Sequence, residues 1–236
     1  MSERLRFFLA ALVALCGAAY AVTSIRALPQ PEIDRNMLFV PSGGLVRGGA
    51  SGYENLMADV LWLSLLQYFG ERYFASNRRM VNLEKMFRLI TALDSRFWFS
   101  YWLGAWALAD NGQPEAALDL LQFGERHNPM EASYPYTQGF VHFLMRSDYE
   151  SAAQCFVRAA EKPVLEWPEQ RRFSQSMAAR MYRELGRREL ALQIWLNMRE
   201  QSTDRALKDI ATRNAQRLQA EIESGAPPSR GARSHR

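Results

Sequence analysis

Apolar positions between residues 53 and 223 recur at the three- and four-residue spacing of helices, and the breaks between these segments recur at a nearly fixed interval. Turn-like junctions are centred on Asp94, Asn128 and Lys162, which follow one another at intervals of 34 residues. Alternating apolar and polar runs, which indicate strands, are scarce. The pattern predicts an all-α fold built from repeated helical hairpins.

Three glycines recur at nearly the same interval. Gly70 and Gly104 lie 34 residues apart, and Gly139 follows 35 residues later. Each glycine falls on the first helix of a predicted pair, where a neighbouring helix must approach closely. The stacked pairs would share one continuous core, because a single hairpin cannot bury its own apolar face.

The breaks divide this region into four helical pairs and one last helix. The predicted pairs are 53–75 with 80–93, 97–110 with 114–127, 131–146 with 149–161, and 171–184 with 188–200. Ser51 and Glu54 form a Ser-x-x-Glu helix start. A last helix begins at Thr203 or Asp204 and ends near Ile222, and its polar outer face suits the cap that a stack of repeats needs. The domain thus covers 53–223, and 224–236 is a flexible basic tail.

The first predicted helix is apolar nearly all round over 56–66. Such a helix should be buried on several sides, by later hairpins, by the membrane surface or by another protein. Asp59 is the one ionisable residue in this run, and a buried carboxylate needs a partner. Either a structural hydrogen bond or a docking or proton-handling role would explain it.

The chain begins with a secretory signal, residues 1–26. Arg4 and Arg6 precede an uncharged, mainly apolar run at 7–25, which predicts a cytoplasmic amino terminus and export of everything that follows. The run is long enough to span a bilayer as a single-pass inner-membrane anchor with the repeat domain in the periplasm. Alternatively, cleavage after the small-x-small sequence at 19–21 would release the domain into the periplasm.

Residues 27–52 are rich in Pro and Gly and do not read as helical. The glycines at 43–44 and 48–49 lack the Lys-Ser/Thr of a phosphate-binding loop. We interpret this stretch as an extended tether that leads from the membrane to the domain and lies along its surface.

The composition limits the kinds of partner and reaction that can be expected. The 29 basic and 25 acidic residues, with a net charge of +4, are interspersed, and the Arg-rich stretch 171–188 is not a basic stripe, so nucleic acid is not an expected partner. Two cysteines and three histidines form no ligand set, so neither a metal nor a cofactor is expected. An envelope hydrolase or transferase using Asp59, or Glu166 with Glu169, is a weak alternative because no nucleophile, base and orienting group are evident.

Residues 53–201 resemble the tetratricopeptide repeat family, although Ala107 stands where that pattern usually has a tyrosine. The matching positions are Gly70, Gly104, Gly139, Ala116, Ala152, Phe156, Ala159, Tyr182 and Trp195. The resemblance implies an α-solenoid of about four hairpins with a capping helix. More narrowly, residues 56–70 look like poorly characterised bacterial envelope proteins that carry such repeats behind a signal anchor.

The resemblance further implies a protein-binding scaffold with a concave groove lined by the first helix of each pair. Its groove positions correspond here to Trp98, Tyr101, Leu108, Tyr136, Phe140, Phe143, Arg180 and Arg183. Asp59 and Trp62 of the first helix are further candidates for partner contact. An apolar segment that ends in acidic residues or a carboxylate would suit an aromatic groove with a basic end. The aromatics could equally be core residues.

Together these features predict a non-enzymatic, membrane-anchored scaffold that holds another envelope or membrane protein and binds no small-molecule substrate. A transient assembly factor or chaperone for an envelope, pilus or cytochrome system is the alternative within the same class.

Overall fold

The computed structural model describes residues 52–73 and 80–225, and for residues 71–73 it describes the backbone alone. The chain divides into two units, Met1–Leu38 and Phe39–Arg236, and every described residue belongs to the second. The described residues form nine α-helices and one π-helical turn and contain no β-strand, so the all-α prediction is confirmed for this part of the chain.

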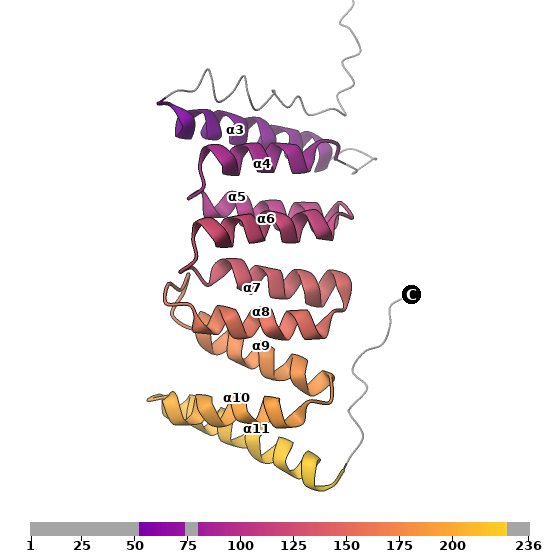
Figure 1. The fold of residues 1–236 in the computed structure, drawn as a ribbon, viewed down its shortest axis with the longest axis vertical. Coiled ribbons are helices and arrows are strands. Elements are labelled where there is room, and N and C mark those ends of the chain that lie inside the picture. Colours follow the sequence, from indigo (N-terminus) through magenta and orange to yellow (C-terminus); the bar gives the residue numbers. More distant parts are fainter. Residues whose placement is uncertain (1–51, 74–79, 226–236) are drawn as a thin grey trace, which may run out of the picture. The chain divides into compact units, whose positions relative to one another are not determined.

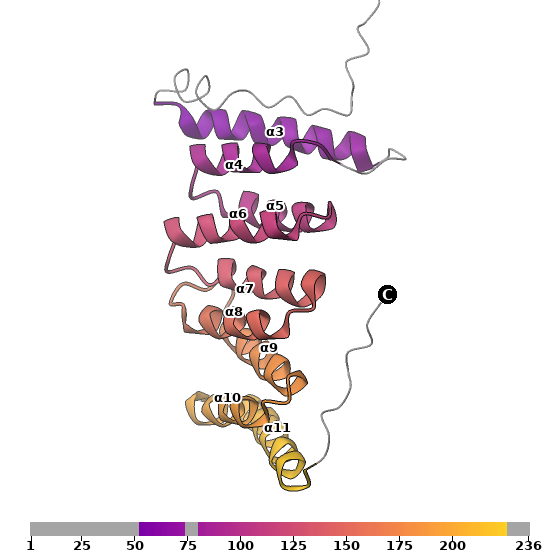
Figure 2. The same cartoon turned by 45° about the vertical axis from the view of Figure 1, so that its right-hand side comes forward.

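The helices follow one another as a row in which each packs against the next along the chain (Figure 1). Figure 2 shows the same order from another side, with α3 at one end and α11 at the other. Their bounds are α3 Glu54–Tyr73, α4 Leu83–Leu93, α5 Trp98–Asp110, α6 Pro114–His127, α7 Ser133–Phe140 with the π-helical turn η1 Val141–Met145, α8 Tyr149–Glu161, α9 Gln170–Glu184, α10 Arg188–Gln201 and α11 Arg205–Glu223.

Local sequence signals account for several of these bounds. The Asp148 carboxylate accepts a hydrogen bond of 3.1 Å from the Ser151 amide and so caps α8. Pro114 occupies the first turn of α6, where its missing N–H costs nothing. Gly112 and Gly186, at φ +79° and +76°, supply the left-handed residues that end α5 and α9. The predicted helices therefore differ from the observed ones by only a few residues at their ends.

Two of the three glycines that mark the repeat do allow close approach. A Cβ atom on Gly104 would lie 2.8 Å from the ring of Phe87, and one on Gly139 would lie 2.8 Å from the ring of Phe156. Gly70 does not share this role, because a Cβ atom there would meet nothing within 4 Å. The position of Gly70 in the interval is therefore not explained by helix packing.

A third close contact has no counterpart in the periodic pattern. A Cβ atom on Gly124 of α6 would overlap the ring of Tyr134 and would lie 2.9 Å from Cδ1 of Tyr101. The two tyrosine rings are buried and meet edge to face with their centroids 5.3 Å apart. Gly124 thus lets α6 approach two buried rings.

Helix α3 is buried on one side only, and its opposite side is exposed. Ala58 and Leu65 are fully buried against the rest of the domain, whereas Leu56 and Leu63 are exposed. Asp59 is also exposed, so the expectation of a buried carboxylate that needs a partner is wrong. The apolar sequence of α3 predicts burial on several sides, but the described hairpins cover only one side of this helix.

Three predicted segments lie outside the described residues. These are the apolar run at 7–25, the tether up to residue 51 and the tail from residue 226. Within 52–73 and 80–225, no helix combines the length and the apolar character needed to cross a membrane.

Replacing Gly124 with Ala should lower the free energy of unfolding by about 1–3 kcal/mol, because the added methyl group overpacks a site between two buried rings. Replacing Gly70 with Ala should raise it by about 0.5–1 kcal/mol, since Gly costs that much more than Ala inside a helix and the site is open. Urea unfolding of the full chain in detergent measures both. Equal effects of the two substitutions would contradict this packing account.

Candidate protein-binding site

Seven exposed or half-buried aromatic side chains lie on α5, α7 with η1, and α9, and we call them the aromatic strip. Its ends are the exposed side chains of Phe99 and Trp102, at 40% and 38% exposure, and Phe173, at 46%. The four members between them are half-buried. The strip consists of Phe99, Trp102, Trp106, Tyr136, Phe140, Phe143 and Phe173.

Ring contacts connect the strip from helix to helix. Phe99 and Trp102 stack at 5.4 Å between centroids, and Trp106 lies one helical turn after Trp102. From α5 the contact passes to α7, where Phe140 lies 6.4 Å from Trp106. On α7, the ring of Tyr136 lies 5.1 Å from that of Phe140.

The strip continues from α7 to α9 through Tyr136. Its ring lies 6.1 Å from Phe173 on α9 and 5.1 Å from Trp167 in the preceding loop. Burial, and then the nearby charge of Glu166, raises the pKa of Tyr136 to about 12. The phenol therefore stays neutral at physiological pH, and Tyr136 offers an apolar ring with a polar tip.

Three of the predicted binding residues belong to the core instead. Tyr101 and Leu108 are fully buried within the stack, and Trp62 is buried against Phe97 and Phe99. Burial raises the pKa of Tyr101 to about 12, although a hydrogen bond to Thr91 acts in the opposite direction. These three side chains cannot form a surface for a partner without unpacking the helices.

Tyr136, Phe140 and Phe143 do lie together on the strip. Trp98 is half-buried and meets Phe99 edge to face at 5.8 Å, beside the strip. Asp59 is exposed on α3 and belongs to none of these ring contacts.

The α5 members of the strip are absent from the sequence-based prediction. Tyr101 and Leu108 stand at the same distances from Gly104 as Tyr136 and Phe143 do from Gly139. On α5 these positions are buried, because α5 and α7 turn different sides toward their neighbours. The sequence of α5 is apolar all round, so hydrophobicity alone does not separate its faces. Ala105 beside Gly104 is the available signal, because two adjacent small residues indicate the packed side of a helix.

The two predicted arginines have different surroundings. Arg180 is exposed and its guanidinium lies 5.9 Å from the centre of the Phe143 ring. Arg183 instead donates hydrogen bonds of 3.2 and 2.7 Å to the carboxylate of Glu221 on α11. Arg183 therefore joins α9 to α11, while Arg180 remains at the surface beside the strip.

A polar cluster is centred on the buried side chain of Gln138 on α7. The Gln138 amide donates to Glu125 at 3.0 Å, and its oxygen accepts from Arg158 at 2.8 Å. Lys162 lies 3.3 Å from the other Glu125 oxygen. Each of these charged or polar groups has a partner, which fits a structural role in joining α6, α7 and α8.

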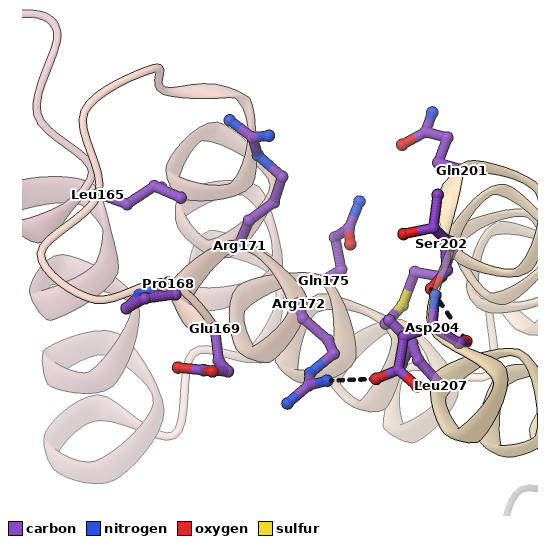
Figure 3. A pocket seen from close by; sticks show the side chains of 12 residues that line it. Leu165, Pro168, Glu169, Arg171, Arg172, Gln175, Gln201, Ser202, Asp204 and Leu207 are labelled. Carbon is purple, nitrogen blue, oxygen red and sulfur yellow. Dashed lines mark hydrogen bonds and ion pairs between the residues drawn. The ribbon is translucent and has the colours of Figure 1, made fainter.

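A polar pocket of about 470 Å³ lies between the start of α9 and the turn that joins α10 to α11 (Figure 3). Its Arg172 lies 3.6 Å from Asp204, and its Arg171 donates to two backbone carbonyls. The Ser202 hydroxyl accepts from the Asp204 amide at 3.0 Å. These groups hold the loop and the start of α11, and no base lies within hydrogen-bonding distance of the Ser202 hydroxyl among the described residues.

Other reactive groups are similarly ill suited to catalysis. Burial raises the pKa of the Cys155 thiol, which makes it a poor nucleophile. Burial, followed by repulsion from Glu131, raises the pKa of Glu166. Within the described residues, no group of three or more His, Cys, Asp or Glu side chains could hold a metal ion.

No protein-family model, curated protein or solved structure matches this chain. The strip must therefore be interpreted from its own geometry.

The Arg183–Glu221 pair predicts a pH-dependent stability. Burial alone would raise the pKa of Glu221, but the hydrogen bond and charge of Arg183, helped by Arg217, lower it. The stabilisation is present above the ordinary carboxyl pKa and is lost as pH falls through the lowered pKa. Replacing Arg183 with Gln should cost about 1–2 kcal/mol at pH 7, and this difference from the unmodified chain should shrink in acid.

Urea unfolding at a series of pH values measures this effect, with Arg180→Gln as the matched control. Arg180 is an exposed arginine on the same helix, and no carboxylate of the described residues lies within ion-pair distance of it. An Arg183→Gln effect that stays constant across the carboxyl range, or an equal effect of Arg180→Gln, would contradict the assignment.

Proposed function

We propose that this chain is a non-enzymatic scaffold whose aromatic strip binds an apolar segment of another envelope protein. The observation that carries the proposal is the run of neighbouring aromatic side chains on three helices, with exposed side chains at both ends. Aromatic side chains that are partly buried before binding are already oriented and supply the largest contributions in protein interfaces.

The chemistry of the strip favours a peptide or helix face over a small ligand. Rings spread along three helices match an extended apolar partner, as in helix-in-groove recognition. Arg180 adds a positive charge beside Phe143, which favours a partner with an acidic side chain or a terminal carboxylate near Phe143. The aromatic side chains of the strip offer no catalytic group, so binding is the function that they support.

The resemblance to tetratricopeptide repeats supports the same proposal, because stacked helical pairs serve as binding surfaces. The apolar run at 7–25, preceded by Arg4 and Arg6, supports export and attachment to the inner membrane. We therefore place the helical domain on the periplasmic side, where its partner is another envelope or membrane protein.

Replacing Phe99 and Trp102 together with Ala should reduce recovery of the partner about tenfold or more, because truncating one such aromatic costs about 2 kcal/mol of binding. The measurement is affinity purification of the tagged full chain from membranes after in-cell crosslinking, with quantitative mass spectrometry of the recovered proteins. Circular dichroism would establish that both variants are folded.

The matched control is Ile210→Ala, which removes an apolar side chain of similar exposure, 41%, from α11. Recovery with this control should equal that of the unmodified chain. The proposal fails if the unmodified chain recovers only itself, or if the double variant recovers the same protein in the same amount.

A further inference from the structure

The two end helices of the row present different outer faces. On α11, Ile210 is the exposed large apolar residue, and most of its exposed positions are charged or polar. This is the polar end that a stack of repeats requires for solubility. The other end helix, α3, departs from that requirement.

The outer face of α3 carries a row of exposed aliphatic side chains, which we call the α3 stripe. Leu56, Val60, Leu63 and Leu66 are 60%, 49%, 65% and 40% exposed, respectively. Their separations of four, three and three residues place them along one side of the helix. The exposed side chains of Asp59 and Gln67 lie on the same side of the helix, so the row is mainly but not wholly apolar. Four exposed aliphatic side chains in a row at the end of a stack indicate that something covers them.

The chain that leads directly into α3 has the composition and length to cover the stripe. Residues 39–46 carry two apolar pairs, Phe39–Val40 and Leu45–Val46. Between them and α3 lies a six-residue link, 47–52, that contains three glycines. Gly52 has a φ of +84°, a conformation that suits a change of chain direction just before the helix.

The lengths of residues 39–46 and of the link 47–52 match the length of the α3 stripe. A Gly-rich sequence of six residues has an average span of about 13 Å, and the stripe is about 15 Å long at the rise of an α-helix. Eight residues in extended form reach about 26 Å, enough to follow the whole stripe. We propose that residues 39–46 fold back and pack along the α3 stripe, forming the cap of this end of the row.

Two other occupants fit less well. The charged groups among the described side chains of α3 are Glu54 and Asp59, and these acids disfavour the anionic lipid surface that amphipathic helices bind through Lys and Arg. A second copy would contribute one narrow stripe, whereas a standard interface buries about 800 Å² per partner. A tethered segment instead acts at an effective concentration in the millimolar range.

The test is photo-crosslinking of the full chain in detergent, with benzoylphenylalanine in place of Leu63 and the product located by mass spectrometry. The expected product is a crosslink within one chain to a peptide that contains residues 39–46. Adding Phe39→Asp and Leu45→Asp to the probe-bearing chain should remove most of that product. A probe in place of Ile210 is the control and should give no crosslink to this peptide.

Because the side chain of Leu63 is exposed, the probe at this position should not unfold the chain. A second probe, in place of Val60, should give the same product. Crosslinks from both probes to a second copy, to detergent or lipid, or to another part of the chain would overturn the proposal. So would a yield no greater than that of the Ile210 control.

Discussion

The close approach of aromatic rings to glycines on neighbouring helices is the constraint on which this arrangement depends. Phe87 lies against Gly104, Tyr134 against Gly124 and Phe156 against Gly139, each at a distance that leaves no room for a Cβ atom. Interiors packed this densely do not tolerate a shift of one helix along another. Because these contacts fix the rotation of the helices from α4 to α8, they also determine which of their side chains remain at the surface.

The aromatic strip is a consequence of that rotation. With Tyr101, Gly104 and Leu108 turned into the stack, α5 leaves Phe99 and Trp102 outside. Its other members lie partly in the core, so the strip is supported from below by packed side chains. A surface built in this way is ordered before a partner arrives, which lowers the entropy cost of binding.

The sequence predicts the helices far better than it predicts their faces. The junctions at Asp94 and Asn128 contain residues that favour turns, and these residues predict where the helices end. Rotation depends on contacts between distant residues, such as Gly124 with Tyr134, which no local pattern encodes. For this reason the strip residues of α7 could be predicted and those of α5 could not.

The same limit applies to α3, whose uniformly apolar sequence predicts burial without saying which side stays exposed. In α11 the polar residues themselves identify the outer face, and the prediction of a polar end agrees with the structure there. The two ends of the row thus differ in chemistry, and the strip lies on the helices between them.

The most direct measurement is a cryo-electron microscopy structure of the full chain with the partner recovered from the membrane. The account predicts apolar side chains of the partner against Phe99, Trp102 and Phe173, with an acidic group near Arg180. A partner that binds elsewhere and leaves these three rings exposed to solvent would contradict it.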